Sequence, residues 1–334
     1  MSSDSGVERI LLISSDPERE IALVSWCLKA LQSVGSPELH VITVLPELDY
    51  SIKRWLSQNP ESHQLEQWVL DENSRRQFMI ELAEAAGVKL IIHVCFGKLF
   101  YDSIQYARFH QVDLVVKMVQ SNPQTLNSLL FDSQDMHLLR KCPMPLLLYK
   151  HGTPLPFSTV MASVDVSLGE DWGDDDNIDL NQQIFQWAQW MNAHQPIHIA
   201  HAWEEGIEFY AKHWSMDLSD QEFNELSEST FRQHQTALSR SIDQIEFTQK
   251  PIVHYLNGEA VDSICQATKS LSTDLLVMGT LARSGLAGFL IGNTAEQVLE
   301  NINCSVLALK PEGFVSPIPP PKEIRPQIIQ VATD

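Results

Sequence analysis

The sequence lacks any apolar run of the roughly 18 residues that are needed to cross a membrane. Its first residues, Met1–Arg9, have neither the basic segment nor the apolar segment of an export signal. The five cysteines are scattered and form no Cys-x-x-Cys pair, which indicates reduced, buried thiols rather than a disulfide framework. We therefore expect a cytoplasmic protein with no membrane insertion.

Basic residues are also scarce, with 23 Lys and Arg against 43 Asp and Glu, for a net charge of -20. A protein that binds nucleic acid needs a basic face, and none is visible in the sequence. Part of the acid lies in one segment, Glu170–Asp179. This segment could hold a divalent cation, but it lacks the spacing of an EF-hand, so we favour a solvated loop that opens a helix.

Motifs for catalysis are missing too. The sequence has no GxSxG, HExxH or GxxxxGK[ST] string. His198 and His201 are separated by an odd number of residues, so in a strand they point to opposite faces and do not share a metal. We therefore expect no enzymatic activity and no metal site.

The chain does contain an internal repeat of about half its length, and 334 residues suit two domains. In each half, five short apolar runs of strand type alternate with helical stretches, which predicts a parallel sheet covered by helices on both faces. The fold class is thus α/β, with two tandem doubly wound domains. The predicted strands are 9–14, 39–45, 89–95, 113–118 and 145–149, then 158–164, 196–202, 250–255, 274–279 and 305–309.

The fourth strand of the second half is followed by a loop that begins at Gly279 and ends at Gly292. Backbone N–H groups of such a loop, and of the helix that follows it, are able to hold a phosphate. The spacing resembles the loop G-x2-G-x9-G-[ST] of the universal stress protein family. The strings Asp135–Pro143, Gly292–Val298 and Leu307–Pro311 resemble those of the E-type tandem members of Gram-negative bacteria.

The resemblance implies a cytoplasmic stress-response protein with five-stranded sheets of order 3-2-1-4-5. It implies one domain over 1–151 and a second over 156–311, followed by a Pro-rich tail over 312–334. Domain 1 is expected to pack on domain 2 through the strands 146–149 and 306–309, and family members are often homodimers. Some members bind ATP, so a small-molecule ligand is expected, with no metal beyond the Mg²⁺ that accompanies a nucleotide.

Carried over residue by residue, Gly279 and Gly292 match the first and third loop glycines, while Ala282 replaces the second. Asn293 stands where a hydroxyl residue is usual, and it also forms a near capping box with Glu296. The ligand-binding residues that the resemblance implies for domain 2 are Asp165, Ala202, Gly279, Thr280, Ala282, Arg283, Ser284, Gly292, Asn293 and Thr294.

The first half departs further from this pattern. Met118 takes the place of Gly279, and Asp132 falls near the third glycine, where a carboxylate would repel phosphate. Asp16 remains after the first strand, at the place that Asp165 holds in the second half, although an Asp before Pro17 is also an ordinary helix start. We predict that domain 1 does not bind nucleotide.

Two other functions remain as alternatives to nucleotide binding. One is a ligand-free scaffold or interaction protein in which both sites are degenerate, and the other is a carrier of an apolar small molecule. In the latter case Ile207, Phe209, Tyr210 and Trp214 would line a crevice of domain 2. A nucleotide-using enzyme is disfavoured, because the sequence has neither an SGGxDS nor an HxGH string. We interpret the Pro-rich tail as a plain extension that forms no packed core, with recruitment of a partner as the alternative.

Overall fold

The computed structural model describes residues 6–32, 35–47, 49, 51, 54–55, 58, 64–119, 131–166, 174–192, 194–204, 219–280, 291–321, 323 and 329–332. The chain divides into two compact units, which we call domain 1 and domain 2. Domain 1 contains Met1–Ser121, Phe131–Leu155 and Val315–Asp334, and domain 2 contains Pro156–Phe314.

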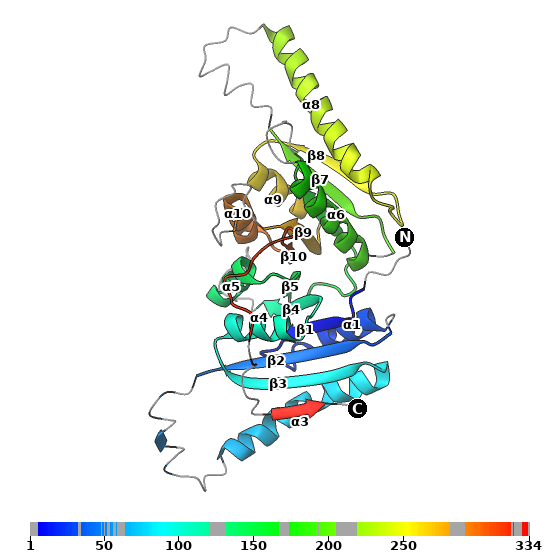
Figure 1. Cartoon of the computed structure of the whole chain (residues 1–334). Coiled ribbons are helices and arrows are strands. Elements are labelled where there is room, and N and C mark those ends of the chain that lie inside the picture. The colour runs from blue at the N-terminus through cyan, green and yellow to red at the C-terminus, as the bar shows by residue number, and fades with distance from the viewer. Residues whose placement is uncertain are drawn as a thin grey trace. The chain divides into compact units, whose positions relative to one another are not determined.

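Domain 1 is built on a parallel sheet in the order β3-β2-β1-β4-β5 (Figure 1). Its strands are β1 (Arg9–Ile13), β2 (Glu38–Pro46), β3 (Lys89–Gly97), β4 (Leu114–Val119) and β5 (Leu146–Lys150). Its helices are α1 (Ile21–Leu31), α3 (Gln64–Ala86), α4 (Leu99–Phe109) and α5 (Ser133–Lys141).

Domain 2 repeats this plan with a parallel sheet in the order β8-β7-β6-β9-β10. Its strands are β6 (Val160–Val164), β7 (His198–Trp203), β8 (Ile252–Asn257), β9 (Leu275–Gly279) and β10 (Ser305–Leu309). Its helices are α6 (Asp174–Met191), α8 (Asp220–Asp243), α9 (Ala260–Ser270) and α10 (Asn293–Asn301). Both domains thus confirm the expected strand order 3-2-1-4-5.

An aspartate at the equivalent position of each domain holds the start of the central strand, which is β1 in domain 1 and β6 in domain 2. Asp113, just before β4, accepts hydrogen bonds from the backbone N–H groups of Glu8 and Arg9 at 2.8 Å. Asp274, just before β9, accepts from the N–H groups of Ser158 and Thr159 at 3.0 Å. The repeat therefore extends from the order of the strands to individual side-chain contacts.

The central strands are buried on both faces, as their continuous apolar runs predict. Every residue of β4 is buried, and so are four of the five residues of β1 and of β9. All five cysteines are buried free thiols. Helix α6 begins at Asp174, so part of the acidic segment Glu170–Asp179 belongs to the helix rather than to the loop before it.

The Pro-rich tail is more than a plain extension. Ile318 is buried, and the hydroxyl of Ser316 donates to the carbonyl of Lys141 at 2.7 Å. Farther on, β11 (Ile329–Ala332) pairs antiparallel with β3 and covers that edge of the sheet (Figure 1). The prolines hide this packing in the sequence, because they remove the periodic signal that helices and strands normally give.

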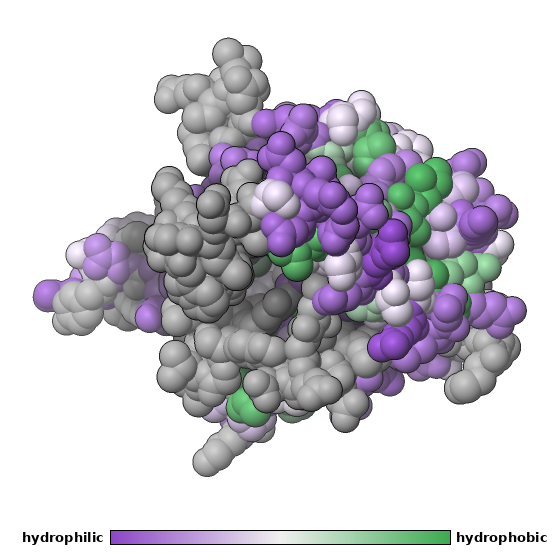
Figure 2. Space-filling model, turned by 90° about the horizontal axis from the view of Figure 1, so that it is seen from above, coloured by the Kyte–Doolittle hydropathy of each residue, from purple (hydrophilic) through white to green (hydrophobic). Residues whose placement is uncertain are grey.

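None of the helices within the described residues is long and apolar enough to span a membrane. The face drawn in Figure 2 is mostly hydrophilic where its residues are described, with apolar groups scattered among the polar ones. That surface fits the excess of acidic residues in the chain.

Candidate functional site

The candidate site lies at the carboxyl edge of the domain 2 sheet, between β6 and β9. The strand that follows β6 in the chain, β7, pairs with one side of it, and β9 pairs with the other. Open α/β sheets bind ligands at such a switch point. Asp165 directly follows β6, and because Val164 pairs with His201, it leaves the sheet beside Ala202 of β7.

Helix α10 opens at this edge without a side-chain cap. Its N-cap residue is Gly292, with φ −60° and ψ 142°, and no side chain of the described residues accepts a hydrogen bond there. The N–H of Gly292 donates to the carbonyl of Thr280 at 3.1 Å, which ties the two ends of the loop together. The positive end of α10 therefore presents the exposed Asn293 and Thr294.

The expected capping box of Asn293 with Glu296 is wrong. Asn293 is the first residue of the helix and not its cap, and its side chain is exposed. Asn is a more frequent N-cap than Gly, so the sequence favours Asn293, but Gly is also tolerated at that position and is the residue used.

Gly279 and Thr280 both have structural reasons for their identity. A Cβ atom on Gly279 would lie 2.7 Å from Cδ2 of Leu180, so the packing of α6 over β9 favours glycine. Thr280 is fully buried, and its hydroxyl donates to the carbonyl of Leu309 and accepts from Nζ of Lys310 at 2.5 Å. The described contacts explain these two residues without a ligand.

Two further residues shape this edge, and sequence reasoning missed their roles. The amide of Asn181, which is buried, donates to the carbonyl of Asp165 at 2.8 Å and holds the loop after β6. Lys310 is buried at the end of β10, with Nζ 5.3 Å from the ring centre of Phe314. Lys310 belongs to the string Leu307–Pro311 noted above, but the sequence alone does not show that the charge of this lysine is buried.

The corresponding helix of domain 1, α5, is closed by carboxylates. The N–H of Asp135 donates to Asp132 at 2.7 Å, and the N–H of Asp132 donates back to Asp135 at 3.1 Å. Nζ of Lys117 lies 2.6 Å from Oδ1 of Asp135, and both side chains are buried. Burial raises the pKa of the Asp135 carboxyl, and the attraction of Lys117 opposes that rise. The protein's own anions thus occupy the positive end of α5.

Another buried carboxylate fills the loop after β1. Glu20 is fully buried and accepts hydrogen bonds from the hydroxyl of Ser14 at 2.5 Å and from the N–H groups of Ser15 and Asp16. The strand registers also correct the expected counterpart of Asp165 in domain 1. Ile10 pairs with Leu114 as Val160 pairs with Leu275, which places Ser15, not Asp16, at that position.

The histidines of β7 have separate partners, as their odd spacing predicts. Nδ1 of His198 lies 2.9 Å from Nε2 of His254 in β8, and Nε2 of His201 lies 2.9 Å from Nδ1 of His234 in α8. Burial lowers the pKa of His201 to about 4, so this ring is neutral at pH 7. No group of three His, Cys, Asp or Glu side chains in the described part of the chain is arranged to hold a metal ion.

Several predicted residues lie outside the described part of the structure. They are Ala282, Arg283 and Ser284 of the loop, and Ile207, Phe209, Tyr210 and Trp214 of the expected crevice. The described members of the predicted set, Asp165, Ala202, Gly279, Thr280, Gly292, Asn293 and Thr294, all lie at or after the carboxyl ends of β6, β7 and β9.

The repeat, the strand order and the switch-point loop agree with a known family. The model of the universal stress protein family matches residues 6–150 and 175–310. The chain belongs to the universal stress protein family. The two matches cover the two domains, so this member of the family is a tandem protein.

Similar universal stress proteins span most of the chain. It is 24% identical to the universal stress protein E homolog of Haemophilus influenzae over 90% of this chain and 96% of that protein. It is 28% identical to universal stress protein E of Photorhabdus laumondii over 71% of this chain and 74% of that protein. A solved structure, a putative universal stress protein from Pseudomonas aeruginosa, shares the fold with a TM-score of 0.62 at 23% identity, covering 93% and 96% of the two chains.

Proposed function

We propose that this protein is a non-enzymatic, cytoplasmic stress-response protein whose second domain binds ATP at the switch point between β6 and β9. The triphosphate would lie at the N-terminus of α10, and the nucleoside would lie toward Asp165 and Ala202. Domain 1 would bind no nucleotide.

One contrast carries this proposal. The repeat builds the same helix twice, but α5 is closed by Asp132 and Asp135, whereas α10 begins at Gly292 with no side-chain cap among the described residues. A phosphate needs the N–H groups that a carboxylate cap would occupy, together with the positive end of the helix. Within the described residues of domain 2, no carboxylate caps the first N–H groups of α10, although Glu296 lies in its first turn.

The surrounding charge supports the same assignment. Lys310 places a buried cation at the carboxyl edge of domain 2, where Thr280 holds it at 2.5 Å. The loop after β6 is held by the neutral amide of Asn181, whereas the loop after β1 is held by the carboxylate of Glu20. The strand registers place Lys150 of domain 1 at the position of Lys310, so the contrast in charge between the domains comes from these loops and from the helix caps.

We infer binding rather than turnover from the state of His201, which pairs with Val164 next to Asp165. Both ring nitrogens of His201 have partners, the carbonyl of Val164 at 3.3 Å and His234 at 2.9 Å. A base that is buried, neutral and doubly hydrogen-bonded is poorly placed to take a proton from an attacking water.

A ligand-free scaffold is the second candidate. The contact of Leu180 with Gly279 and the buried hydroxyl of Thr280 explain two of the predicted ligand residues by packing alone. If packing also explains the loop over 281–290, no nucleotide is needed.

Calorimetric titration of ATP with Mg²⁺ separates the two candidates. Gly292→Asp copies the cap of domain 1 and should abolish binding, because its carboxylate would occupy the N–H groups and repel phosphate. Gly292→Asn is the matched control, since it adds a cap of equal size without the charge, and it should retain more affinity than Gly292→Asp. Absence of binding to the wild-type protein at millimolar ATP would favour the scaffold.

A further inference from the structure

The two domains share a second feature, a groove between neighbouring helices. In domain 1 it lies between α4 and α5, and in domain 2 it lies between α9 and α10. Helices α4 and α9 have the same length of 11 residues, and each is followed by a non-glycine residue of positive φ, Gln111 or Ser272. This alignment places Gln266 at the position of Gln105, and Lys269 at the position of Arg108.

In domain 1 the groove is occupied by the Pro-rich tail. The amide of Gln105 donates to the carbonyl of Pro319 at 3.4 Å, and the guanidinium of Arg108 donates to the carbonyl of Ile318. At the end of α5, the carbonyl of Lys141 accepts from the hydroxyl of Ser316 at 2.7 Å. The tail is therefore held largely through its backbone, by donors from one face of α4.

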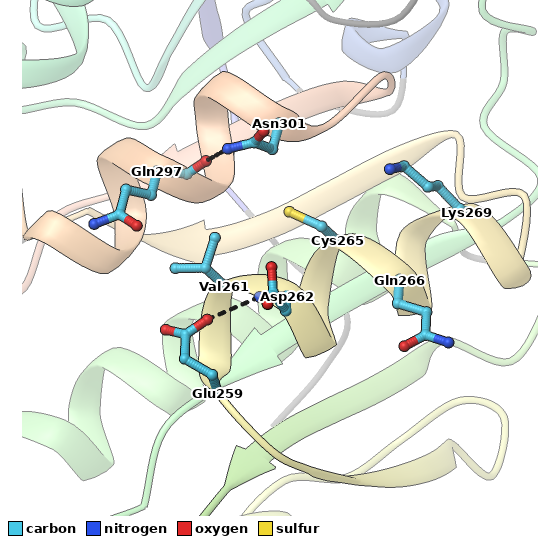
Figure 3. Close-up of a pocket in the computed structure, with 8 residues that line it drawn as sticks. All are labelled: Glu259, Val261, Asp262, Cys265, Gln266, Lys269, Gln297 and Asn301. Atoms are coloured by element: carbon cyan, nitrogen blue, oxygen red, sulfur yellow. Dashed lines mark hydrogen bonds between the residues drawn. The ribbon is translucent and has the colours of Figure 1, made fainter.

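In domain 2 the equivalent groove is open, with a volume of about 450 Å³ (Figure 3). Cys265 points from α9 toward α10, while Gln297 and Asn301 line the side of α10. Within the described residues, the side chains of Gln266 and Lys269 donate no hydrogen bond to another residue. The two donors that hold the tail in domain 1 thus have counterparts in domain 2 that face an open groove.

Smaller side chains account for part of this space. In domain 1, Nζ of Lys141 lies 4.3 Å from the ring centre of Phe100, and these two side chains fill part of the space between the helices. Val261 and Asn301 take these positions in domain 2, and both line the open groove. Domain 2 therefore has hydrogen-bond donors at the same positions, Gln266 and Lys269, but smaller side chains between its two helices.

We propose that the groove between α9 and α10 is a docking site for an extended, proline-containing segment of a partner protein. The backbone carbonyls of that segment would accept hydrogen bonds from Gln266 and Lys269. A polyproline conformation suits this role, because its carbonyls make no internal hydrogen bonds and remain available to outside donors.

The direction of the tail predicts the charge of the partner. In domain 1 the tail runs from Lys141 and Arg108 toward Gln105, that is, toward the N-terminus of α4. A segment in the same direction on α9 would next reach Glu259 and Asp262, which line the other end of the groove. A basic residue after the prolines would therefore be favoured by two carboxylates.

The charge of the chain also argues against a second copy as the occupant. Its net charge of -20 makes two copies repel each other, whereas a basic segment of another protein is attracted. The chain's own tail is already used, since Ile318 is buried in the structure of domain 1.

A labelled peptide with the sequence of residues 314–323 provides the probe, because it contains the prolines and the lysine of the tail. Titrated into the full-length protein by fluorescence anisotropy, it should bind at one site. Lys269→Glu should weaken binding about tenfold or more, since it replaces a charged donor by a repelling group. Lys250→Glu, the same change at an exposed lysine of domain 2 that does not line the groove, should leave the affinity unchanged.

Circular dichroism and thermal unfolding would show that both variants fold. Replacing Lys322 of the peptide by Glu should also weaken binding, because Glu259 and Asp262 would then repel it. No saturable binding at millimolar peptide, or equal affinity for the wild type and Lys269→Glu, would overturn the proposal. Dimerisation of the protein that the peptide abolishes would assign the groove to the tail of a second copy, and would overturn it as well.

Discussion

Nζ of Lys117 and Oδ1 of Asp135 lie 2.6 Å apart, with both side chains almost completely buried in domain 1. At the corresponding positions domain 2 has Met278 and Ala295, which are also buried. An ion pair has thus been exchanged for an apolar pair at the same place in two copies of one fold. The exchange coincides with the presence or absence of a carboxylate cap on the following helix.

Breaking this ion pair should be costly. Lys117→Met or Asp135→Ala alone leaves one buried charge without its partner, which we expect to lower the free energy of unfolding by about 3–5 kcal/mol. The double variant copies domain 2 and should recover most of that loss, because an apolar pair of this kind is often as stable as a buried ion pair. Urea unfolding of the wild type, the two single variants and the double variant at pH 7 measures the coupling energy between Lys117 and Asp135.

Additive effects in that cycle would contradict the account. If the double variant lost the sum of the two single losses, the ion pair would not be the reason for either residue. Met278→Lys in domain 2 is a useful comparison, since it introduces a buried charge opposite Ala295 and should destabilise the protein.

Gly279 should accept a small side chain only if Leu180 moves aside. Gly279→Ala places a Cβ atom 2.7 Å from Cδ2 of Leu180, and because this atom ends a flexible, partly exposed side chain, we expect a loss of only about 1 kcal/mol from the overpacking. On a Leu180→Ala background the same substitution should cost little, because the clashing atoms are gone. A full loss in both backgrounds would show that Leu180 is not the cause.

Acid should destabilise domain 1 through two buried histidines. Burial, together with the charge of nearby His110, lowers the pKa of His40 and of His93 to about 4 in the folded protein. The unfolded chain has the ordinary value of 6.5. Stability is therefore complete above pH 6.5 and falls as the pH drops toward 4, because only the unfolded state gains protons.

The size of this effect can be measured by unfolding at pH 6.5 and pH 5. Each histidine should contribute a loss of about 1.5 kcal/mol over that interval. His93→Phe keeps a ring against Tyr106, 4.9 Å away between ring centres, and should flatten the pH dependence by that amount. His151→Gln, at an exposed position, is the control and should leave the slope unchanged. An equal slope in His93→Phe would disprove the assignment.

Removing the tail should expose an edge of domain 1. A chain that ends at Phe314 loses both the buried Ile318 and the strand β11 that covers β3. We expect lower stability and association between molecules through the exposed edge, detected by light scattering after size-exclusion chromatography. A chain that ends at residue 323 loses only β11, so it should associate but retain the contacts of Ser316 and Ile318. Unchanged stability and mass in both chains would show that the tail is dispensable.

The sequence predicted the fold well because apolar runs and helical stretches alternate in both halves. The continuous runs at Leu114–Val119 and Leu275–Gly279 became central strands, and the order of strands followed from the repeat. These signals are local, since burial of a strand on two faces requires an unbroken apolar run.

The site was predicted less completely because its decisive contacts join distant residues. Lys117 and Asp135 belong to a strand and a later helix, and Glu20 folds back onto the loop before it. The packing of the tail on α4 joins Gln105 to Pro319 across most of the chain. A carboxylate near a lost glycine suggested repulsion of phosphate, but only the structure pairs Asp132 with Asp135.

The central claim is that the two copies of the fold differ in one property, the binding of a nucleotide at domain 2 alone. Photolabelling with 8-azido-ATP, followed by proteolysis and mass spectrometry, tests it most directly. The account predicts saturable label on peptides from residues 156–314, which excess ATP prevents and Gly292→Asp abolishes. Label on peptides from residues 1–151, or no label that ATP competes away, would contradict it.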